Sequence, residues 1–197
     1  AWVEPGVINL ELSDYLKSFG FHYAPDPSSQ QICTLGGNVA NNSGGPHCLA
    51  DGVTDTHVLA LEVVLPNGEV TIFGGLDAEP AGLDLRGAFI GSEGTLGITT
   101  KIAVRLTPNP DDVQTLLISF PSMRKAAETV SAIIADGIVP AAMEAMDQKT
   151  IEVIEKHIPS GYPTDAGAVL LVEVEGLPDG VEICLLYTSP SPRDALE

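Results

Sequence analysis

The sequence predicts an α+β fold made of two consecutive units. Two alternating β-branched runs flank Pro66-Asn67-Gly68, a pattern typical of an antiparallel hairpin. Later in the chain, strand-like apolar runs alternate with runs of helical period. Between the two patterns, Pro108 and Pro110 stand among polar residues, and such stretches carry few packing contacts. We therefore expect one unit over 1–110 and another over 111–183.

The first unit should begin with an amphipathic helix over about 8–20. Asn9 is the expected N-cap and Gly20 the stop. A polar loop with two prolines then leads into the glycine-rich segment 34–45. After the hairpin, a short helix, a glycine-punctuated turn over 91–97 and a strand to about residue 106 complete the unit. The apolar face of the first helix is expected to comprise Leu12, Tyr15, Leu16 and Phe19.

The second unit should alternate strands and helices: strand 114–120, helix 122–137, strand 141–147, helix 148–158 and strand 168–176. Gly137 is the expected C-cap of the first of these helices, and Asp147 the expected N-cap of the second. This order is typical of a ferredoxin-like α+β sandwich. The apolar face of the first helix should comprise Met123, Ala126, Ala127, Val130, Ile133 and Ile134.

The charge balance makes polyanionic partners unfavourable. Lys and Arg number 9 against 27 Asp and Glu, which gives a net charge of −18 that would repel nucleic acid and anionic membranes. No apolar run has the length of a transmembrane helix, and no signal peptide is recognisable. Because the chain opens on Ala1 rather than Met, we expect a truncated start. The 3 cysteines form no C-x-x-C motif, which favours a reducing compartment.

The final segment, 184–197, differs abruptly in character from the sequence before it. Its residues CLLYTSPSPRD are what a transposase-type sequencing adapter encodes when it is translated. The alternative interpretation is a strand followed by a Ser-Pro linker. We expect an adapter-derived tail and exclude it from the functional argument.

Two segments could hold an anion with main-chain amides. In GSEGTLG, Gly91 to Gly97, glycines recur every third residue between a helix and a strand, so amides can converge as they do around phosphate. The motif is neither a Walker loop nor G-x-G-x-x-G, and a structural turn is the commoner explanation. The segment 34–45 is either a flexible loop or a backbone packed close to a ligand. The bases between Asp26 and Pro110 are few, namely Arg86, Lys101 and Arg105, so amides would have to do much of the neutralisation.

Other polar residues give weaker signals. Ser43 and Ser92 lack the G-x-S-x-G context of a nucleophile. Glu144 and Asp147 could form a carboxylate pair, although helix capping by Asp147 explains that residue more simply. The histidines show no metal-ligand spacing and are expected to be scattered structural residues: His22, His47, His57 and His157.

Taken together, three segments resemble one family. APDPSSQQICTLGGNVANNSGGPHCLADGVT, VLALEVVLPNGEV and GLDLRGAFIGSEGTLGITT occur in this order and spacing in the vanillyl-alcohol-oxidase (PCMH-type) superfamily. The strongest likeness is to the FAD-linked component of bacterial glycolate oxidases and to D-lactate dehydrogenases. The resemblance implies the C-terminal half of a PCMH-type FAD-binding domain followed by the start of a substrate-cap domain, together covering residues 1 to 176.

The resemblance also implies a site for non-covalent FAD, in which the two small-residue bends lie side by side along the flavin. Small residues avoid collision with the cofactor there, and main-chain amides hold it. His47 lies within this signature without an assigned role. The residues that match FAD-contacting positions of the family are Pro27, Ser28, Ser29, Thr34, Gly36, Gly37, Asn38, Asn41, Asn42, Ser43, Gly44, Glu93, Gly94, Thr95, Leu96, Gly97 and Ile98.

The family's other functional parts have no counterpart here. Its first flavin loop would precede residue 1, and its divalent-metal ligands and proton-accepting histidine would follow residue 183, so no residue is assigned as catalytic. The resemblance implies an oxidoreductase that acts on glycolate or D-lactate, with an unknown electron acceptor and companion glycolate oxidase subunits. It also implies a cytoplasmic location, at most peripheral to the inner membrane. The alternatives are a flavin-dependent transferase related to ether-lipid synthases, which share EGTLG, and a non-catalytic flavin-binding module.

Overall fold

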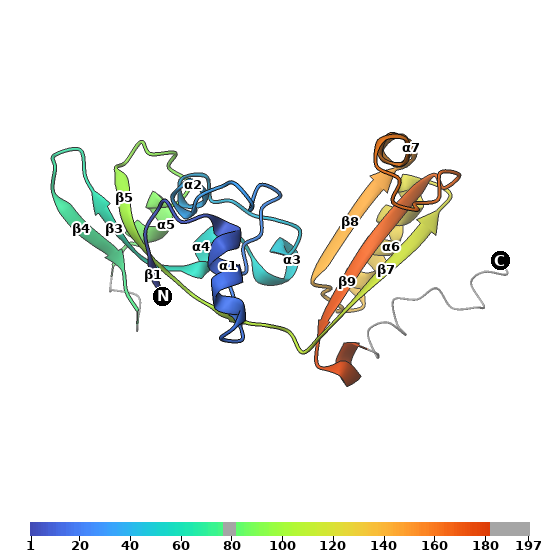
Figure 1. The fold of residues 1–197 in the computed structure, drawn as a ribbon, viewed down its shortest axis with the longest axis horizontal. Helices are drawn as coiled ribbons and strands as arrows, with labels where there is room; N and C mark the ends of the chain where they lie inside the picture. Colours follow the sequence, from blue (N-terminus) through green and yellow to red (C-terminus); the bar gives the residue numbers. More distant parts are fainter. Residues whose placement is uncertain (77–81, 182–197) are drawn as a thin grey trace. The chain divides into compact units, whose positions relative to one another are not determined.

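The computed structural model describes residues 1–76 and 82–181, and it divides the chain into two compact units (Figure 1). The first unit is Ala1–Asn109, and the second begins at Pro110. Each unit combines helices with an antiparallel sheet, which confirms the expected α+β class. The predicted adapter-derived tail, 184–197, lies outside the described residues.

The first unit is built on a four-stranded sheet with the strand order β1-β5-β3-β4. The central pair is antiparallel, as is the hairpin of β3 with β4. In the turn, the Gly68 amide donates to the Leu65 carbonyl at 2.8 Å, and Gly68 has a φ of +82° that favours glycine. The hairpin prediction is thus confirmed. The strands are β1 (Trp2–Val3), β3 (Val58–Val64), β4 (Val70–Gly74) and β5 (Ile98–Val104).

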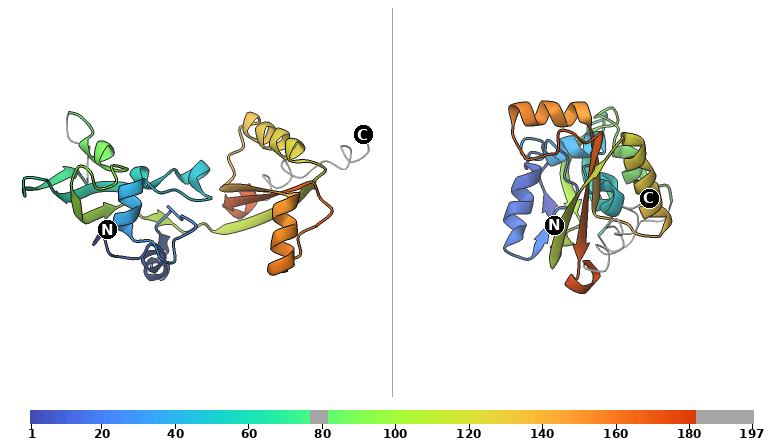
Figure 2. Two further views of the ribbon diagram at one scale, coloured as in Figure 1. Left: turned by 90° about the horizontal axis from the view of Figure 1, so that it is seen from above. Right: turned by 90° about the vertical axis from the view of Figure 1, so that its right-hand side faces the viewer.

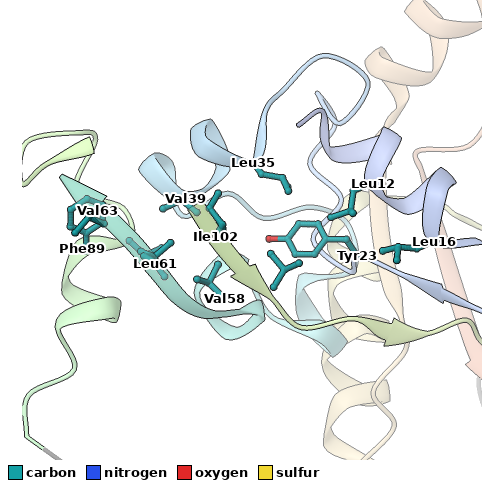
Figure 3. Packing of buried hydrophobic residues seen from close by; sticks show 12 residues of the cluster. Leu12, Leu16, Tyr23, Leu35, Val39, Val58, Leu61, Val63, Phe89 and Ile102 are labelled. Atoms are coloured by element: carbon teal, nitrogen blue, oxygen red, sulfur yellow. The ribbon is translucent and has the colours of Figure 1, made fainter. Parts of the chain in front are cut away.

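One face of this sheet carries the core of the first unit (Figure 3). Leu61 of β3 and Ile102 of β5 are paired neighbours, and both are fully buried. Helix α1 (Asn9–Lys17) contributes Leu12 and Leu16, and the ring of Tyr23 packs in the same cluster. Leu61 and Val63 of β3 and Ile102 and Val104 of β5 lie two residues apart in their strands and join this cluster, which fixes the sheet face that the helices cover.

Helix α1 corrects two expectations. Its N-cap is Ile8, and Asn9 instead lies fully buried with its Nδ2 donating to the Pro25 carbonyl at 2.9 Å. The side chains of Tyr15 and Phe19 are 70% and 61% exposed, and their rings contact each other on the surface. Helical spacing predicted four core positions on α1, but only Leu12 and Leu16 face the sheet and are buried.

Short elements connect the larger ones, and of these the sequence analysis predicted only the short helix after the hairpin. A two-stranded sheet pairs β2 (Phe21–His22) with β6 (Thr107–Pro108), so the expected strand to residue 106 ends earlier, at Val104. The short helices are α3 (Cys48–Asp51), α4 (Thr54–His57) and α5 (Leu85–Phe89).

Helix α2 (Leu35–Asn41) forms within the glycine-rich segment 34–45, which the sequence analysis expected to be either a flexible loop or a backbone packed close to a ligand. Thr34 caps it, accepting from the Gly37 amide at 3.2 Å. The amides of Leu35 and Gly36 donate to the Val7 and Pro5 carbonyls at 2.9 and 2.8 Å. External acceptors therefore stabilise a helix that glycine disfavours.

The second unit has a three-stranded sheet with the order β7-β9-β8. Strand β9 (Ala168–Gly176) pairs antiparallel with β7 (Asp112–Phe120) and with β8 (Ala142–Asp147), so β7 and β8 run parallel with β9 between them. Helix α6 (Met123–Ala135) connects these two, which makes a split βαβ unit of the ferredoxin-like kind.

The two helices of this unit lie on opposite faces of the sheet (Figure 2). Leu170, Val172 and Val174 pack on the α6 side, whereas Val169 packs with Ile151 of α7 (Gln148–His157) on the other. The apolar face predicted for α6 contained more residues than the structure buries. Ala126 and Ile133 are buried and Val130 packs against the cluster, whereas Met123, Ala127 and Ile134 are exposed. The C-cap of α6 is Asp136, with the expected Gly137 one residue later at a φ of +82°.

The capping role expected of Asp147 is confirmed. Its Oδ1 accepts from the Thr150 amide at 2.8 Å at the start of α7. The hydrogen bonds from Thr150 hold the pKa of the Asp147 carboxyl below its ordinary value. The folded state therefore gains stability from this carboxylate above the ordinary aspartate pKa, and loses that stability as pH falls through the lowered pKa.

Replacing Leu61 by alanine should lower the free energy of unfolding by about 2–5 kcal/mol, because the buried side chain leaves a cavity. Ile72→Ala is the matched control, since Ile72 in the neighbouring strand is 57% exposed and should change stability by less than about 0.5 kcal/mol. Urea titration followed by circular dichroism measures both. Equal losses for the two variants would contradict the assigned core face.

Gly36→Ala and Gly37→Ala should change stability in opposite directions. A Cβ on Gly36 would lie 2.7 Å from the Pro5 Cβ, so this variant should lose about 1–3 kcal/mol through overpacking. A Cβ on Gly37 would meet only the Thr34 Oγ1, at 3.5 Å, so that variant should gain up to about 1 kcal/mol from helix propensity. The comparison of their thermal midpoints checks the helix, and a destabilised Gly37→Ala would count against it.

Asp147→Asn should flatten the acid dependence of stability. Asparagine can still cap α7, but it does not titrate. The wild-type protein should have a higher free energy of unfolding than the variant above the ordinary aspartate pKa, and this difference should disappear in acid. Unfolding curves recorded over a pH series would measure it. A constant difference at every pH would argue against a titrating cap.

Candidate functional site

The two small-residue segments lie side by side, as the sequence analysis expected. The amides of Gly91 and Glu93 donate to the carbonyls of Val39 and Ala40 at 2.8 and 2.9 Å. These carbonyls belong to the last turn of α2. The glycine turn, defined here as Gly91–Gly97, thus supplies a donor to Ala40 and a second, shorter bond to Val39, which also accepts from the Asn42 amide at 3.4 Å. Main-chain bonds join residues about fifty positions apart in the sequence into one surface.

The second segment, called the asparagine bend and defined as Asn42–Gly44, follows α2 directly. Asn42 has a φ of +48°, a left-handed conformation that asparagine tolerates better than most residues. Its Oδ1 accepts from the Asp55 amide at 2.9 Å. The Ser43 carbonyl accepts from both the amide and the Oγ1 of Thr54, at 3.0 and 2.7 Å. The beginning of α4 therefore holds this bend in place.

The loop before α2 joins the same region through Asp26. The Asp26 Oδ2 lies 2.6 Å from Nδ1 of His47, and both side chains are partly buried. A Cβ on Gly45 would collide with the carbonyl and carboxylate of Asp26, so this approach requires glycine. His47 had no assigned role in the sequence analysis. The structure gives it one, because its imidazole links residues 26 and 47 across the loop.

Several glycines of the site are explained by packing against the chain itself. A side chain on Gly44 would collide with Cys48 Sγ and would lie 2.8 Å from Val53 Cγ1. One on Gly97 would lie 2.7 Å from the Val64 carbonyl oxygen. Gly94, by contrast, faces open space at a φ of +76°. The expectation that the small residues spare room for a cofactor therefore fits Gly37 and Gly94, but not Gly36, Gly44 or Gly97.

The available amides differ from those that the sequence analysis expected. The Gly36, Gly37 and Asn38 amides all donate to acceptors within the chain, Asn38 to the Thr34 carbonyl at 2.9 Å. The main-chain amides of these three residues are therefore already paired within the chain. Four amides elsewhere in the two segments have no acceptor within residues 1–76 and 82–181, those of Gly44, Gly94, Leu96 and Gly97.

Two buried side-chain atoms add further hydrogen-bonding capacity. Asn38 Nδ2 is unpaired among the described residues although the side chain is only 1% exposed, and Ser92 Oγ is likewise buried without a partner there. An unpaired buried donor costs stability, so such groups are expected to meet a water or a ligand. Ser92 escaped the sequence analysis because the only test applied to it was the nucleophile motif. These donors fit a ligand rich in acceptor oxygens, as a flavin nucleotide is.

The remaining expected residues fall into two groups. Those at the edge of α2 and its preceding loop mostly serve the chain: Pro27 accepts from the Gln30 amide, Thr34 caps α2, and Asn41 Nδ2 donates to Gly37. The others are exposed or partly exposed: Ser28, Ser29, Glu93, Thr95, Leu96 and Ile98.

Cations contribute little at this site. Arg86 donates to the Val58 carbonyl at 2.7 Å and lies 3.6 Å from the Asp84 carboxylate, and Lys101 pairs with Glu62 at 3.1 Å. Arg105 is exposed on the surface. Because the first two are engaged by the chain, an anion would depend on amides and hydroxyls, as the sequence analysis expected.

The histidines are dispersed. His22 contacts Asn109 Oδ1, His57 contacts the Asp51 carbonyl, and His157 is exposed at the end of α7. Across the described ranges, no three His, Cys, Asp or Glu side chains are grouped so as to hold a metal ion. In the same part of the chain, no helix has both the length and the apolar character to cross a bilayer.

Two family models match the chain, one in each structural unit. Residues 1–74 match the FAD binding domain, and residues 109–182 match the C-terminal domain of FAD linked oxidases. The first match contains α2 and the asparagine bend, whereas the glycine turn lies between the two matches.

Curated relatives extend over nearly the whole chain. Glycolate oxidase subunit GlcD of Escherichia coli K12 is 46% identical over 182 residues, and that of Bacillus subtilis is 49% identical over 183, each covering 92% of this chain. A D-lactate dehydrogenase of Anaerostipes hadrus is 34% identical over 88% of the chain. The chain spans only 36%, 39% and 38% of these three relatives.

Among solved structures, an alkyldihydroxyacetonephosphate synthase superposes with a TM-score of 0.82. The match covers 95% of this chain and 37% of that one at 22% sequence identity, so it shows the fold alone. Family models, curated relatives and fold agree. The chain therefore belongs to the FAD-linked oxidases, with a PCMH-type FAD-binding domain followed by the C-terminal domain of that family.

Proposed function

We propose that the full-length protein containing this chain is an FAD-dependent oxidoreductase that oxidises a 2-hydroxy acid, glycolate or D-lactate, to the 2-oxo acid. The observation that carries the proposal is the 46% and 49% identity to two glycolate oxidase subunits over 92% of the chain. The D-lactate dehydrogenase relative supports the same class of substrate. Because the chain spans little more than a third of these proteins, the activity is assigned to the full-length protein.

The first unit contains the groups that would hold FAD. The amides of Gly44, Gly94 and Leu96 and the buried Asn38 Nδ2 are donors without acceptors among the described residues. Ser28 and Ser29, in the loop before α2, are exposed and carry further hydroxyl donors. Donors outnumber available cations, which suits a ligand whose phosphate and carbonyl oxygens accept hydrogen bonds. These residues therefore fit FAD.

FAD, when bound, accepts a hydride from the carbon that carries the substrate hydroxyl. The residues of this chain bind and orient the cofactor, and the bonds between the glycine turn and α2 keep its donors in fixed positions. No described residue is assigned as the base. The proposal assigns that residue, and any divalent metal, to sequence beyond residue 183.

The proposal extends to partners and location. The relatives of 46% and 49% identity are named as subunits, which favours a complex with companion glycolate oxidase subunits. The electron acceptor is not assigned. Cys33 and Cys48 are free thiols, which suits a reducing cytoplasm. We further propose that the protein contacts the inner membrane peripherally and passes electrons on there.

A transferase function is less well supported. The alkyldihydroxyacetonephosphate synthase shares the fold at 22% identity, well below the likeness to glycolate oxidase subunits. In the second alternative, a non-catalytic flavin-binding module, the first unit would bind the flavin but the protein would catalyse no reaction. Both alternatives predict that 2-hydroxy acids fail to reduce the bound flavin.

Anaerobic addition of glycolate or D-lactate to the full-length holoprotein should bleach the visible absorbance of the oxidised flavin, because the proposed reaction transfers a hydride to it. Acyl-dihydroxyacetone phosphate serves as the control and should leave the spectrum unchanged. Flavin that stays oxidised with every 2-hydroxy acid tested would refute the proposal.

A further inference from the structure

One peptide group of the asparagine bend is held from a single side. The Ser43 carbonyl receives two hydrogen bonds from Thr54, from its amide at 3.0 Å and from its Oγ1 at 2.7 Å. Thr54 is completely buried, so neither bond competes with bulk water. The carbonyl of the peptide between residues 43 and 44 therefore points firmly toward α4.

The direction of this carbonyl also sets the direction of the next amide. A trans peptide is planar, and its N–H lies opposite its C=O. The structure contains no cis peptide bond among the described residues, so the Gly44 N–H points away from α4. It has no acceptor in the described part of the chain, and Gly44 is only partly buried. A polar hydrogen in such a position is expected to meet a ligand or water.

Rotation of this peptide is opposed on both sides of the bond. The α-carbon of Gly44 lies so near Cys48 and Val53 that no side chain fits there. Asn42, two residues earlier, is fixed by the hydrogen bond from the Asp55 amide to its Oδ1. The amide direction is thus determined by the chain before any ligand arrives.

The buried Tyr23 phenol interacts with Thr54. Burial raises the pKa of this phenol, and a smaller interaction with the Thr54 side chain opposes that rise. The Tyr23 side chain is 3% exposed and packs among the core residues shown in Figure 3. Thr54 is therefore anchored to the core on one side and to the bend on the other.

We infer that Thr54 is a positioning residue for cofactor binding. It locks the Ser43 carbonyl inward, and the Gly44 N–H is thereby presented as a fixed donor to an oxygen of the flavin nucleotide. This inference rests on the proposed function only in taking FAD as the ligand. It assigns a role to α4, which the sequence analysis did not connect with the site.

The first experiment observes the Gly44 amide directly. The full-length apoprotein, labelled with ¹⁵N-glycine and ¹³C-carbonyl serine, is titrated with FAD and followed by amide NMR. The Gly44 signal is identified by its coupling to the preceding Ser43 carbonyl, which Ser43→Ala removes. The Gly44 proton should shift strongly downfield on binding, whereas the surface control Gly68, in the hairpin turn, should stay in place. A Gly44 resonance that ignores saturating FAD would overturn the inference.

The second experiment separates the Thr54 hydroxyl from its packing. Thr54→Val removes the Oγ1 bond but keeps the shape, and should raise the Kd for FAD about three- to tenfold, as expected for one net hydrogen bond. Thr54→Ser restores the hydroxyl and should bind within about twofold of wild type. Thr56→Val is the matched control, because Thr56 Oγ1 bonds the Val53 and Asp51 carbonyls rather than that of Ser43.

The outcomes distinguish this inference from the proposed function. Unchanged FAD affinity in Thr54→Val, or equal weakening in Thr54→Ser and Thr56→Val, would overturn the positioning role. If Thr54→Val does not fold, the NMR titration of the wild-type protein still decides. Binding of FAD without reduction by 2-hydroxy acids would refute the proposed reaction and leave the role of Thr54 intact.

Discussion

Two main-chain hydrogen bonds between the glycine turn and the last turn of α2 hold the candidate site together. They satisfy the Ala40 carbonyl, and they give the Val39 carbonyl a shorter bond than the 3.4 Å one from the Asn42 amide. By doing so they bring residues from two remote parts of the chain to one surface. The bonds to α2 are made by the first residues of the turn. The amides of Gly94 and Leu96, a few positions later, are therefore without an acceptor among the described residues.

The glycines of this region serve two different purposes. Gly36, Gly44 and Gly97 allow the chain to pass close to itself, at Pro5, Cys48 and Val64 respectively. Gly37 and Gly94 face space that the chain does not fill. A glycine-rich signature therefore mixes packing requirements with ligand requirements, and only the surroundings of each α-carbon separate the two.

Sequence reasoning succeeded where a feature depends on near neighbours. The hairpin around Gly68, the cap at Asp147 and the helices of the second unit follow from local pattern. Sequence reasoning failed where partners remote in the sequence decide. Asn9 does not cap α1, because its side chain donates to the Pro25 carbonyl instead. Tyr15 and Phe19 are exposed because the sheet covers only part of the helix.

The sequence by itself determined the α+β class, the two-unit order and the likeness to FAD-linked oxidases, because spacing, turn residues and motifs are all written along the chain. Only the tertiary structure decided which amides remain free among the described residues, that Asp26 reaches His47, and that Thr54 fixes the asparagine bend. Each of these depends on where a hydrogen-bond partner lies in space, and a partner many residues away leaves no mark on the local pattern.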